Sequence, residues 1–164
     1  MVEISINIKQ NGFTIVELIV VITIVAIISV IAVPRFITTP NLDGQTQQLL
    51  SDLRYTQMLA ITHGQRFRVN FTSSTTYTIT NTSGTAVANP STNGNTITFT
   101  GGVTMSLPPT NLPNNLVAFD ENGIPYTDSA ATTALAANAT ITLTRNGINR
   151  SIVITQKTGS MIAQ

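Results

Sequence analysis

The chain contains no cysteine, no tryptophan and only one histidine, and charged residues make up 9% of its 164 residues. Ordinary soluble domains carry roughly 25% charged residues. The lack of cysteine excludes a disulfide, a thiolate zinc site and a cysteine nucleophile within the chain. Eight basic residues stand against seven acidic ones, so the formal net charge is +1, which excludes a nucleic-acid binder that relies on bulk positive charge.

Small polar residues and apolar residues take the place of the missing charges. The sequence has 28 Thr, 15 Asn and 11 Ser, and 42% of its residues are hydrophobic. The length fits one domain of ordinary size plus an appendage. This composition is typical of an exported, β-rich surface, and an apolar chain with so few charges indicates a membrane stretch.

One long apolar run extends from residue 13 to residue 33, reading FTIVELIVVITIVAIISVIAV. As a helix rising ~1.5 Å per residue, it is long enough to cross a hydrocarbon layer of ~30 Å. The alternative is a cleaved signal peptide, whose apolar region spans about 7 to 15 residues after a positively charged start. This run is longer, and its leader offsets the single Lys9 with Glu3. The sequence therefore predicts a transmembrane helix over residues 13–33.

Glu17 lies five residues into this run. An ionised carboxylate at the centre of a bilayer costs on the order of 2.5 kcal/mol or more, and less near the interface. One interpretation is that Glu17 lies in the headgroup region. The other is that it neutralises a cation from another chain, because Lys9 and Arg35 are the only basic residues nearby in the sequence.

The stretch KQNGFTIVE at residues 9–17, with the apolar run and Pro34 after it, resembles the N-terminus of type IV pilins and of the pseudopilins of type II secretion. In that family a prepilin peptidase cuts after the glycine, here Gly12, and methylates the new amino terminus, here Phe13. The resemblance also gives Glu17 a partner, since the family's glutamate attracts the free amine of a neighbouring subunit during filament assembly.

Elementary electrostatics agrees with this assignment. Cleavage after Gly12 removes the leader charges and leaves a positive amine four residues before the Glu17 carboxylate. Paired between subunits, the two charges offset each other's desolvation, whereas each alone opposes burial. Pro34 removes one backbone donor at the end of the run, so it either kinks the helix there or ends it.

A second helix is predicted after Pro34. Its apolar residues recur at helical spacing and predict an amphipathic helix over residues 41–62: Leu42, Leu49, Leu50, Leu53, Ala60 and Ile61. Pro40 and Gly44 leave open a break between the two helices. His63 and Gly64 form a plausible helix end, with histidine in the last turn and glycine just past the cap.

The hydrophobic period changes to two after Gly64, which predicts half-buried strands. The alternating segments are 67–71, 77–79, 97–99, 103–107, 116–119, 124–126, 140–144 and 151–155, with a last edge strand at 159–162. Residues 145–150, with Asn146-Gly147, predict the loop of a hairpin. The alanine-rich segment 128–138 is compatible with a loop or a short helical turn. We divide the chain into a leader at 1–12, the transmembrane helix at 13–33, its amphipathic continuation at 34–64 and a β-rich domain at 65–164.

A helix followed by antiparallel strands is the layout of pilins. Three later features resemble the minor pseudopilins and minor pilins of the GspH/FimT family: the helix end running through His63-Gly64 directly into a strand, the segment 119–125 (FDENGIP), and a closing hairpin with glycine and arginine near its turn. The resemblance implies an α+β, pilin-like fold, in which a long N-terminal transmembrane helix packs on a C-terminal antiparallel β-sheet domain.

The resemblance implies a structural subunit of a type II secretion pseudopilus or a type IV pilus. Its expected partners are other pilin or pseudopilin subunits, the prepilin peptidase, the inner-membrane assembly platform and, before assembly, membrane lipid. We expect a single-pass inner-membrane protein with a periplasmic C-terminal domain, which then enters a periplasmic pseudopilus or a cell-surface pilus. The sequence does not choose between secretion, twitching and DNA uptake.

The alternative function is DNA binding in natural transformation, because some minor pilins bind DNA through arginines near the C-terminus. Arg145, Arg150 and Lys157 are the candidates, if they lie on one edge of the closing hairpin. The family's DNA-binding pattern places two arginines close after a glycine, whereas Gly147 is followed by Ile148, Asn149 and Arg150.

An enzyme is the least supported interpretation. The sequence has no glycine-rich phosphate loop, no cluster with metal-ligand spacing and no Ser-His-Asp arrangement around its single His63. We therefore expect no catalytic residue, no metal site and no cofactor.

Overall fold

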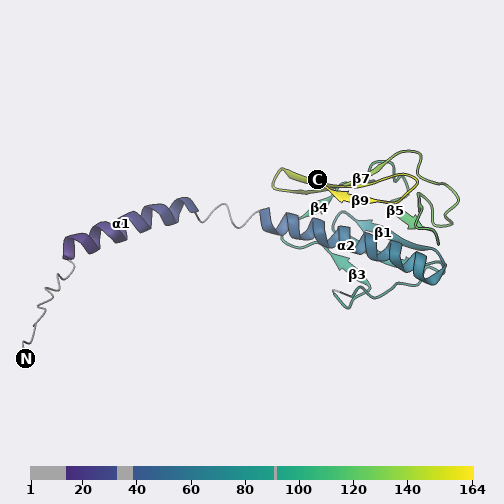
Figure 1. Ribbon diagram of the computed structural model, residues 1–164, viewed down its shortest axis with the longest axis horizontal. Coiled ribbons are helices and arrows are strands. Elements are labelled where there is room, and N and C mark those ends of the chain that lie inside the picture. Colours follow the sequence, from purple (N-terminus) through teal and green to yellow (C-terminus); the bar gives the residue numbers. More distant parts are fainter. Residues whose placement is uncertain (1–13, 33–38, 91) are drawn as a thin grey trace, which may run out of the picture. The chain divides into compact units, whose positions relative to one another are not determined.

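A computed structural model describes the backbone of residues 14–32, 39–90 and 92–164, and the side chains of these residues except 27–32 and 39–40. The chain divides into two compact units, residues 1–38 and residues 39–164 (Figure 1). The first contains helix α1 (Ile15–Ala32), and the second contains helix α2 (Thr39–His63) and all the strands that the structure describes.

Helix α2 forms where the apolar stripe predicts it. Pro40 lies in its first turn, where a backbone N–H has no partner within the helix in any case. At the other end, Gly64 adopts a φ of +58°, and the Gln65 N–H donates to the Ala60 carbonyl at 3.3 Å. This is the bond pattern of a Schellman cap, which confirms the predicted helix end.

One residue of the predicted apolar stripe is not in the core. Leu42, Leu49 and Leu53 are buried, whereas Ile61 is 53% exposed. Ile61 lies on the flank of the helix, with its side chain directed at the turn around Gly123, where a Cβ would meet its Cδ1 at 3.0 Å. The prediction for Ile61 was therefore wrong, because Ile61 lies about 100° around the helix from the buried Ala60 and so falls beside the buried stripe rather than on it.

The strands form two antiparallel sheets. The first has the order β3-β2-β1-β5-β6 and the second the order β4-β7-β8-β9. The first comprises β1 (Phe67–Ser73), β2 (Thr76–Asn81), β3 (Thr96–Thr98), β5 (Leu116–Phe119) and β6 (Pro125–Tyr126). The second comprises β4 (Thr104–Met105), β7 (Ala139–Arg145), β8 (Ile148–Ile154) and β9 (Met161–Ala163). An antiparallel β-sheet domain with a packed helix is the predicted fold class, which is confirmed.

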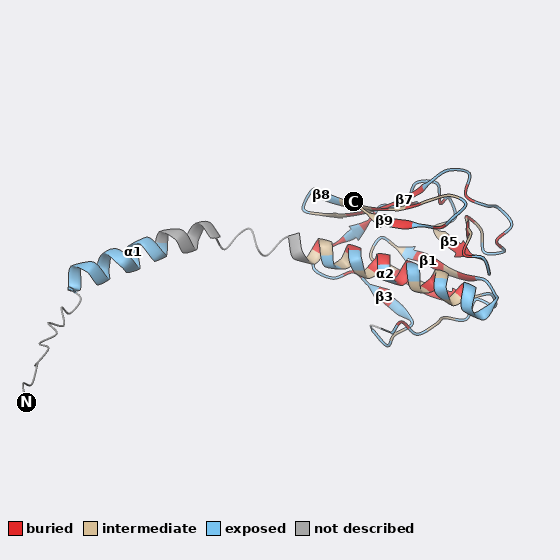
Figure 2. Ribbon diagram, viewed as in Figure 1, coloured by how far each residue is buried: buried red, intermediate tan, exposed pale blue. Residues whose placement is uncertain are grey.

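Helix α2 packs on both sheets, contacting β1 and β5 of the first and β7, β8 and β9 of the second. Buried residues line the helix face and the strand faces that meet it, while the outer faces are exposed (Figure 2). The period-two burial of β1 and β7 matches the alternation read from the sequence. All the buried core residues that the structure describes lie between residues 42 and 161, so the second unit encloses its own core.

Two loop predictions are refined by the structure. The closing hairpin turns within Asn146 and Gly147, which have φ values of 50° and 77°, so Arg145 and Arg150 belong to strands rather than to a six-residue loop. Positive φ at both central residues is the geometry that Asn-Gly favours in a two-residue hairpin turn. The segment 128–138 forms turns rather than a helix, around the Asp128 carboxylate, which accepts backbone N–H bonds from Thr132 and Thr133.

Candidate functional site

The start of α1 is fixed by Thr14. Its hydroxyl oxygen accepts the backbone N–H of Glu17 at 3.2 Å, and its carbonyl accepts the N–H of Leu18 at 3.2 Å. Thr14 is therefore the N-cap, and Glu17 is the third helical residue of a Thr-x-x-Glu sequence, the spacing of a capping box. Sequence analysis missed this role of Thr14, although the spacing was readable. Gly12 and Phe13, the predicted processing site, lie outside the described residues, as does Pro34.

Glu17 has an exposed side chain in the first turn of α1. The positive end of the helix macrodipole favours a carboxylate at this position. Within the described part of the chain, no side chain forms a hydrogen bond or ion pair with the Glu17 carboxylate. The carboxylate is thus placed to meet a partner from outside the described residues.

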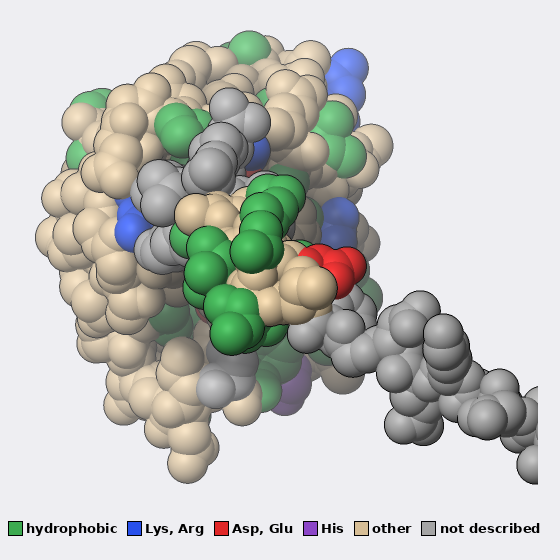
Figure 3. All heavy atoms as spheres, turned by 90° about the vertical axis from the view of Figure 1, so that its left-hand side faces the viewer, with side chains coloured by type: hydrophobic (Ala, Val, Ile, Leu, Met, Phe, Trp, Pro, Cys, Tyr) green, Lys and Arg blue, Asp and Glu red, His purple; other side chains and the backbone are tan. Residues whose placement is uncertain are grey.

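The surface of α1 is apolar on every side. The described side chains, at residues 14–26, are all exposed, and all are hydrophobic except Thr14, Glu17 and Thr23. In Figure 3 these hydrophobic side chains gather together, with an acidic group at one side of them. Ile15 is 79% exposed and Val16 71%. Such an apolar surface requires contact with lipid or with another protein, because no described residue of the chain packs against it. None of the helices that the structure describes combines the length and the apolarity that a membrane span requires.

Gln57 joins α2 to two distant turns. Its side-chain amide donates to the Gly123 carbonyl at 2.8 Å and lies 3.3 Å from the Gly159 carbonyl. A Cβ on Gly159 would meet the Gln57 amide nitrogen at 2.5 Å and the Gly123 oxygen at 2.5 Å. The FDENGIP segment and the turn before β9 therefore meet on the helix at one point, which only glycine fits.

A buried carboxylate lies on the opposite flank of α2. Asp52 is 4% exposed and accepts the Tyr77 hydroxyl at 2.6 Å and the Gln48 amide at 3.1 Å. Burial, and then the Asp52 charge, raise the pKa of Tyr77 far above its usual range. Tyr77 therefore remains a protonated donor at physiological pH. Both groups are buried, so this bond links α2 to β2 within the core of the domain.

A cavity of about 350 Å³ lies at the C-terminal end of α2, beside Arg66, Asp120 and Tyr126. The Tyr126 hydroxyl donates to Asp120 at 3.3 Å, and desolvation, followed by the Asp120 charge, raises the pKa of Tyr126. The other Asp120 oxygen accepts two backbone N–H groups of its own turn, from Asn122 and Ile124. This carboxylate is therefore occupied in shaping the FDENGIP turn.

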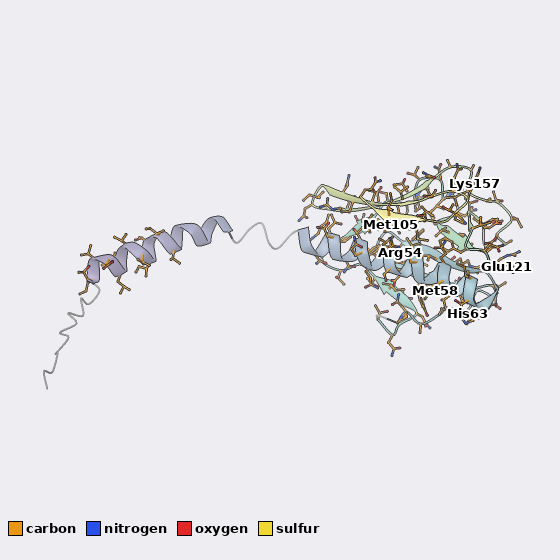
Figure 4. All side chains as sticks on the ribbon, viewed as in Figure 1. Arg54, Met58, His63, Met105, Glu121 and Lys157 are labelled. Carbon is orange, nitrogen blue, oxygen red and sulfur yellow. The ribbon has the colours of Figure 1, made fainter. Side chains whose placement is uncertain are left out.

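The three candidate DNA contacts do not lie together. Arg145 and Arg150 lie beside the β7–β8 turn, where Arg150 pairs with Leu143 in register. Lys157 lies in the turn after β8, so the length of β8, about 20 Å, separates it from that end. Figure 4 shows Lys157 at the same end of the domain as His63. The expectation that all three share one edge was wrong, because Lys157 follows β8 and therefore lies at the opposite end of that strand from the β7–β8 turn.

Arg150 already has a partner within the domain. Its Nε donates to Asp43 Oδ1 at 2.6 Å, which links β8 to the first turns of α2. Both side chains are more than a third exposed, so the pair contributes at most about 1 kcal/mol to stability. This ion pair orients the guanidinium toward the helix and weakens the case for a phosphate contact.

Comparison with known families and structures decides the classification. The prokaryotic N-terminal methylation motif matches residues 7–33, and the family of the type II transport protein GspH matches residues 45–159. The chain belongs to the GspH family. No curated protein matches the chain.

Two solved structures share the fold of this GspH family member. The minor pseudopilin EpsH of the Vibrio cholerae type 2 secretion system aligns with a TM-score of 0.56 and 14% identity, over 76% of this chain and 96% of that one. The type IV minor pilin FimU of Pseudomonas aeruginosa aligns with a TM-score of 0.54 and 16% identity, over 75% of this chain and 87% of that one. The resemblance to the GspH/FimT group is thus confirmed.

The two matching segments contain most of the candidate residues. The methylation motif includes Gly12, Phe13 and Glu17, and the GspH match includes the Gln57 contacts with the two turns. Within residues 14–32, 39–90 and 92–164, no three His, Asp or Glu side chains are close enough to hold a metal ion.

Proposed function

We propose that this GspH family member is a minor pseudopilin or minor pilin, a structural subunit of a type II secretion pseudopilus or a type IV pilus, and not an enzyme. The observation that carries the proposal is the contrast between its two units. Residues 39–164 bury their own core, whereas α1 exposes apolar side chains all round. A helix of this kind serves as an anchor in lipid first and as packing surface for neighbouring subunits afterwards.

Maturation by the prepilin peptidase follows from the methylation motif. The peptidase cuts between Gly12 and Phe13 and methylates the Phe13 amine. The mature chain then begins two residues before α1, and its amine lies in front of the Glu17 carboxylate of a neighbour. The exposure of Glu17, and its lack of a side-chain partner among the described residues, support pairing with that amine.

The same reasoning predicts the location. Before assembly the subunit is a single-pass protein of the inner membrane with its β-rich domain in the periplasm. The assembly platform then moves it from lipid into a periplasmic pseudopilus or a cell-surface pilus, where charge pairing and helix packing replace lipid contact.

Processing is tested by intact mass and N-terminal sequencing of the protein from membranes, with and without the prepilin peptidase. We expect a chain beginning at methylated Phe13 only when the peptidase is present. A start at Met1 or Val33 in its presence contradicts the proposal.

Assembly is tested by Glu17→Gln, with Glu121→Gln as the matched control, because Glu121 is an exposed carboxylate in a turn of the β-rich domain. We expect Glu17→Gln to reduce recovery in sheared filaments severalfold and Glu121→Gln to leave it unchanged, with equal amounts of both in membranes. Equal incorporation of the two variants refutes the charge pairing.

A further inference from the structure

Asparagine is followed directly by glycine at three places in the described part of the chain, all outside its helices and strands: Asn93-Gly94, Asn122-Gly123 and Asn146-Gly147. In such a pair the glycine nitrogen attacks the asparagine side-chain amide readily, because glycine has no Cβ to hinder the approach. The attack needs a glycine N–H that is free of other hydrogen bonds and a backbone that is able to rotate. The three pairs share this chemistry and differ in how the fold restrains them.

The fold holds the Asn122-Gly123 pair firmly. Gly123 is buried, and its N–H donates to the Asp120 carbonyl at 2.9 Å. The Asn122 N–H donates to the Asp120 carboxylate at 2.9 Å, and the Gly123 carbonyl accepts the Gln57 amide at 2.8 Å. Rotation of this backbone breaks these bonds, so the pair is protected.

The Asn93-Gly94 pair is restrained by a buried residue. Asn89 is 0% exposed; its carbonyl accepts the Asn93 N–H at 2.7 Å, and its own N–H donates to the Gly94 carbonyl at 3.0 Å. The Gly94 N–H donates to the Thr92 hydroxyl at 3.4 Å. These bonds enclose the pair and oppose rotation of its backbone.

The Asn146-Gly147 pair has no comparable restraint. Both residues are exposed in the turn between β7 and β8, beyond the last paired residues, Arg145 and Ile148. Within the described residues, neither the Gly147 N–H nor the Asn146 side chain forms a hydrogen bond. A Cβ built on Gly147 meets no atom within 4 Å apart from those of its chain neighbours. The nitrogen is therefore open to solvent, and opening the turn disturbs only the end of one hairpin.

We propose that Asn146 is a site of spontaneous deamidation, and that the fold directs this reaction to Asn146 and away from the other two pairs. Hydroxide removes the Gly147 amide proton, and the nitrogen bonds to Asn146 Cγ. The side-chain nitrogen takes a proton from water and leaves as ammonia, which regenerates hydroxide and gives a five-membered succinimide ring. Water opens the ring at either carbonyl, so the product is aspartate or isoaspartate. One water is consumed and one ammonia is released, with no oxidant or reductant.

The reaction changes both the charge and the backbone of the turn. Either product adds a carboxylate, which removes the formal net charge of +1. Isoaspartate also adds one backbone atom to a loop that fits two residues with positive φ. We expect the pair of Arg145 with Ile148 to open and the core to remain, because Ile148 is 38% exposed. This reactivity belongs to the turn itself and does not depend on the proposed function.

The test compares the three asparagines in one preparation. The full chain is incubated in detergent at mildly alkaline pH, and a second sample is unfolded in guanidinium chloride to give the intrinsic reactivity of each site. Trypsin, used at mildly acidic pH, cuts after Arg145 and Arg150, so the peptide 146–150 reports Asn146. A chymotryptic digest reports the other two sites. Mass spectra measure the conversion of amide to acid, and fragment spectra assign it to one residue.

In the folded chain we expect Asn146 to convert about tenfold faster than Asn93 or Asn122, and in the unfolded chain at a rate similar to both. Gly147→Ala is expected to slow the conversion of Asn146 severalfold, because a Cβ hinders the attacking nitrogen. The matched control is Gly102→Ala. Gly102 has the same φ of 77° and equally open surroundings but does not follow an asparagine, so this change is expected to leave the rate unaltered.

Equal conversion of the three sites in the folded chain overturns the proposal, because the fold then gives Asn146 no preference. A conversion rate in Gly147→Ala equal to that of wild type also overturns it, because the glycine nitrogen is then not the attacking group. Conversion of Asn149 in place of Asn146 within the tryptic peptide assigns the reaction to the wrong residue and has the same consequence.

Discussion

Tyr77→Phe isolates one buried hydrogen bond and leaves the packing around it in place. The ring lies 5.4 Å from the ring of Phe99, and phenylalanine preserves that contact. The change removes the hydroxyl that donates to Asp52 at 2.6 Å, so the buried carboxylate keeps only its side-chain bond from Gln48. A hydrogen bond to a charged group contributes about 1.5 to 3 kcal/mol. At pH 7 we therefore expect a loss of about 2 kcal/mol, or roughly 8 °C in melting temperature.

The same bond makes the difference between wild type and variant depend on pH. Burial and Asp52 raise the pKa of Tyr77 in the folded domain, whereas an unfolded tyrosine titrates near its ordinary value of about 10. Above that value the unfolded chain loses a proton that the folded chain keeps. Wild-type stability then falls by up to about 1.4 kcal/mol per pH unit relative to Tyr77→Phe. The advantage of wild type is complete below pH 10 and is lost by roughly pH 11.5.

The assay uses residues 39–164, which enclose their own core. Their unfolding in urea is monitored by circular dichroism at several pH values between 7 and 11.5. Other titratable groups ionise in both proteins and affect both equally. The quantity to compare is therefore the difference in free energy of unfolding between wild type and Tyr77→Phe at each pH. A difference that stays constant through pH 11.5 refutes the argument that Tyr77 retains its proton because it is buried against Asp52. A difference near zero at pH 7 refutes the assigned strength of the bond.

Three further changes have expected outcomes. Gly159→Ala is expected to lower the free energy of unfolding by roughly 2 kcal/mol or more in urea titrations, because Gly159 has a positive φ and its new Cβ would clash with the Gly123 carbonyl oxygen. The control Gly64→Ala also has a positive φ but no atom within 4 Å of the new Cβ, so it is expected to cost about 1 kcal/mol. Arg150→Ala is expected to cost at most about 1 kcal/mol, less in high salt, and gel-shift titrations are expected to show no salt-dependent DNA retardation with or without it. Thr14→Val removes the N-cap at a cost of about 1 kcal/mol, seen as severalfold faster hydrogen exchange of the Glu17 amide, which Thr14→Ser restores.

Much of the fold was predictable because apolar and polar residues alternate clearly along its strands. The burial of Phe67, Val69 and Phe71 in β1 follows the period of two that the sequence shows. The end of α2 was equally readable, since histidine followed by glycine matches the geometry of a helix cap. Ile61 was misassigned because Ala60 and Ile61 are adjacent apolar residues, and periodicity alone does not show which of the two faces the sheets.

The candidate site was predictable where it depends on local sequence. The Thr-x-x-Glu spacing that caps α1 lies within four residues, and the Asn-Gly turn within two. Contacts between distant segments leave no local pattern. Nothing in the sequence shows that Asp43 pairs with Arg150, or that one amide of α2 reaches both Gly123 and Gly159. Whether three cations share an edge depends on strand length and register, which only the assembled sheets define.

The Gln57 amide also has a consequence for the order of folding. It closes loops of 66 and 102 residues, so its contacts come after much of the chain has already been ordered. Contacts that close long loops gain nothing until the entropy of closure has been overcome. We therefore expect the junction to be absent from the rate-limiting transition state. Substitutions there are expected to speed unfolding and leave the refolding rate almost unchanged, so this one side chain sets the lifetime of the native domain more than the speed of its formation.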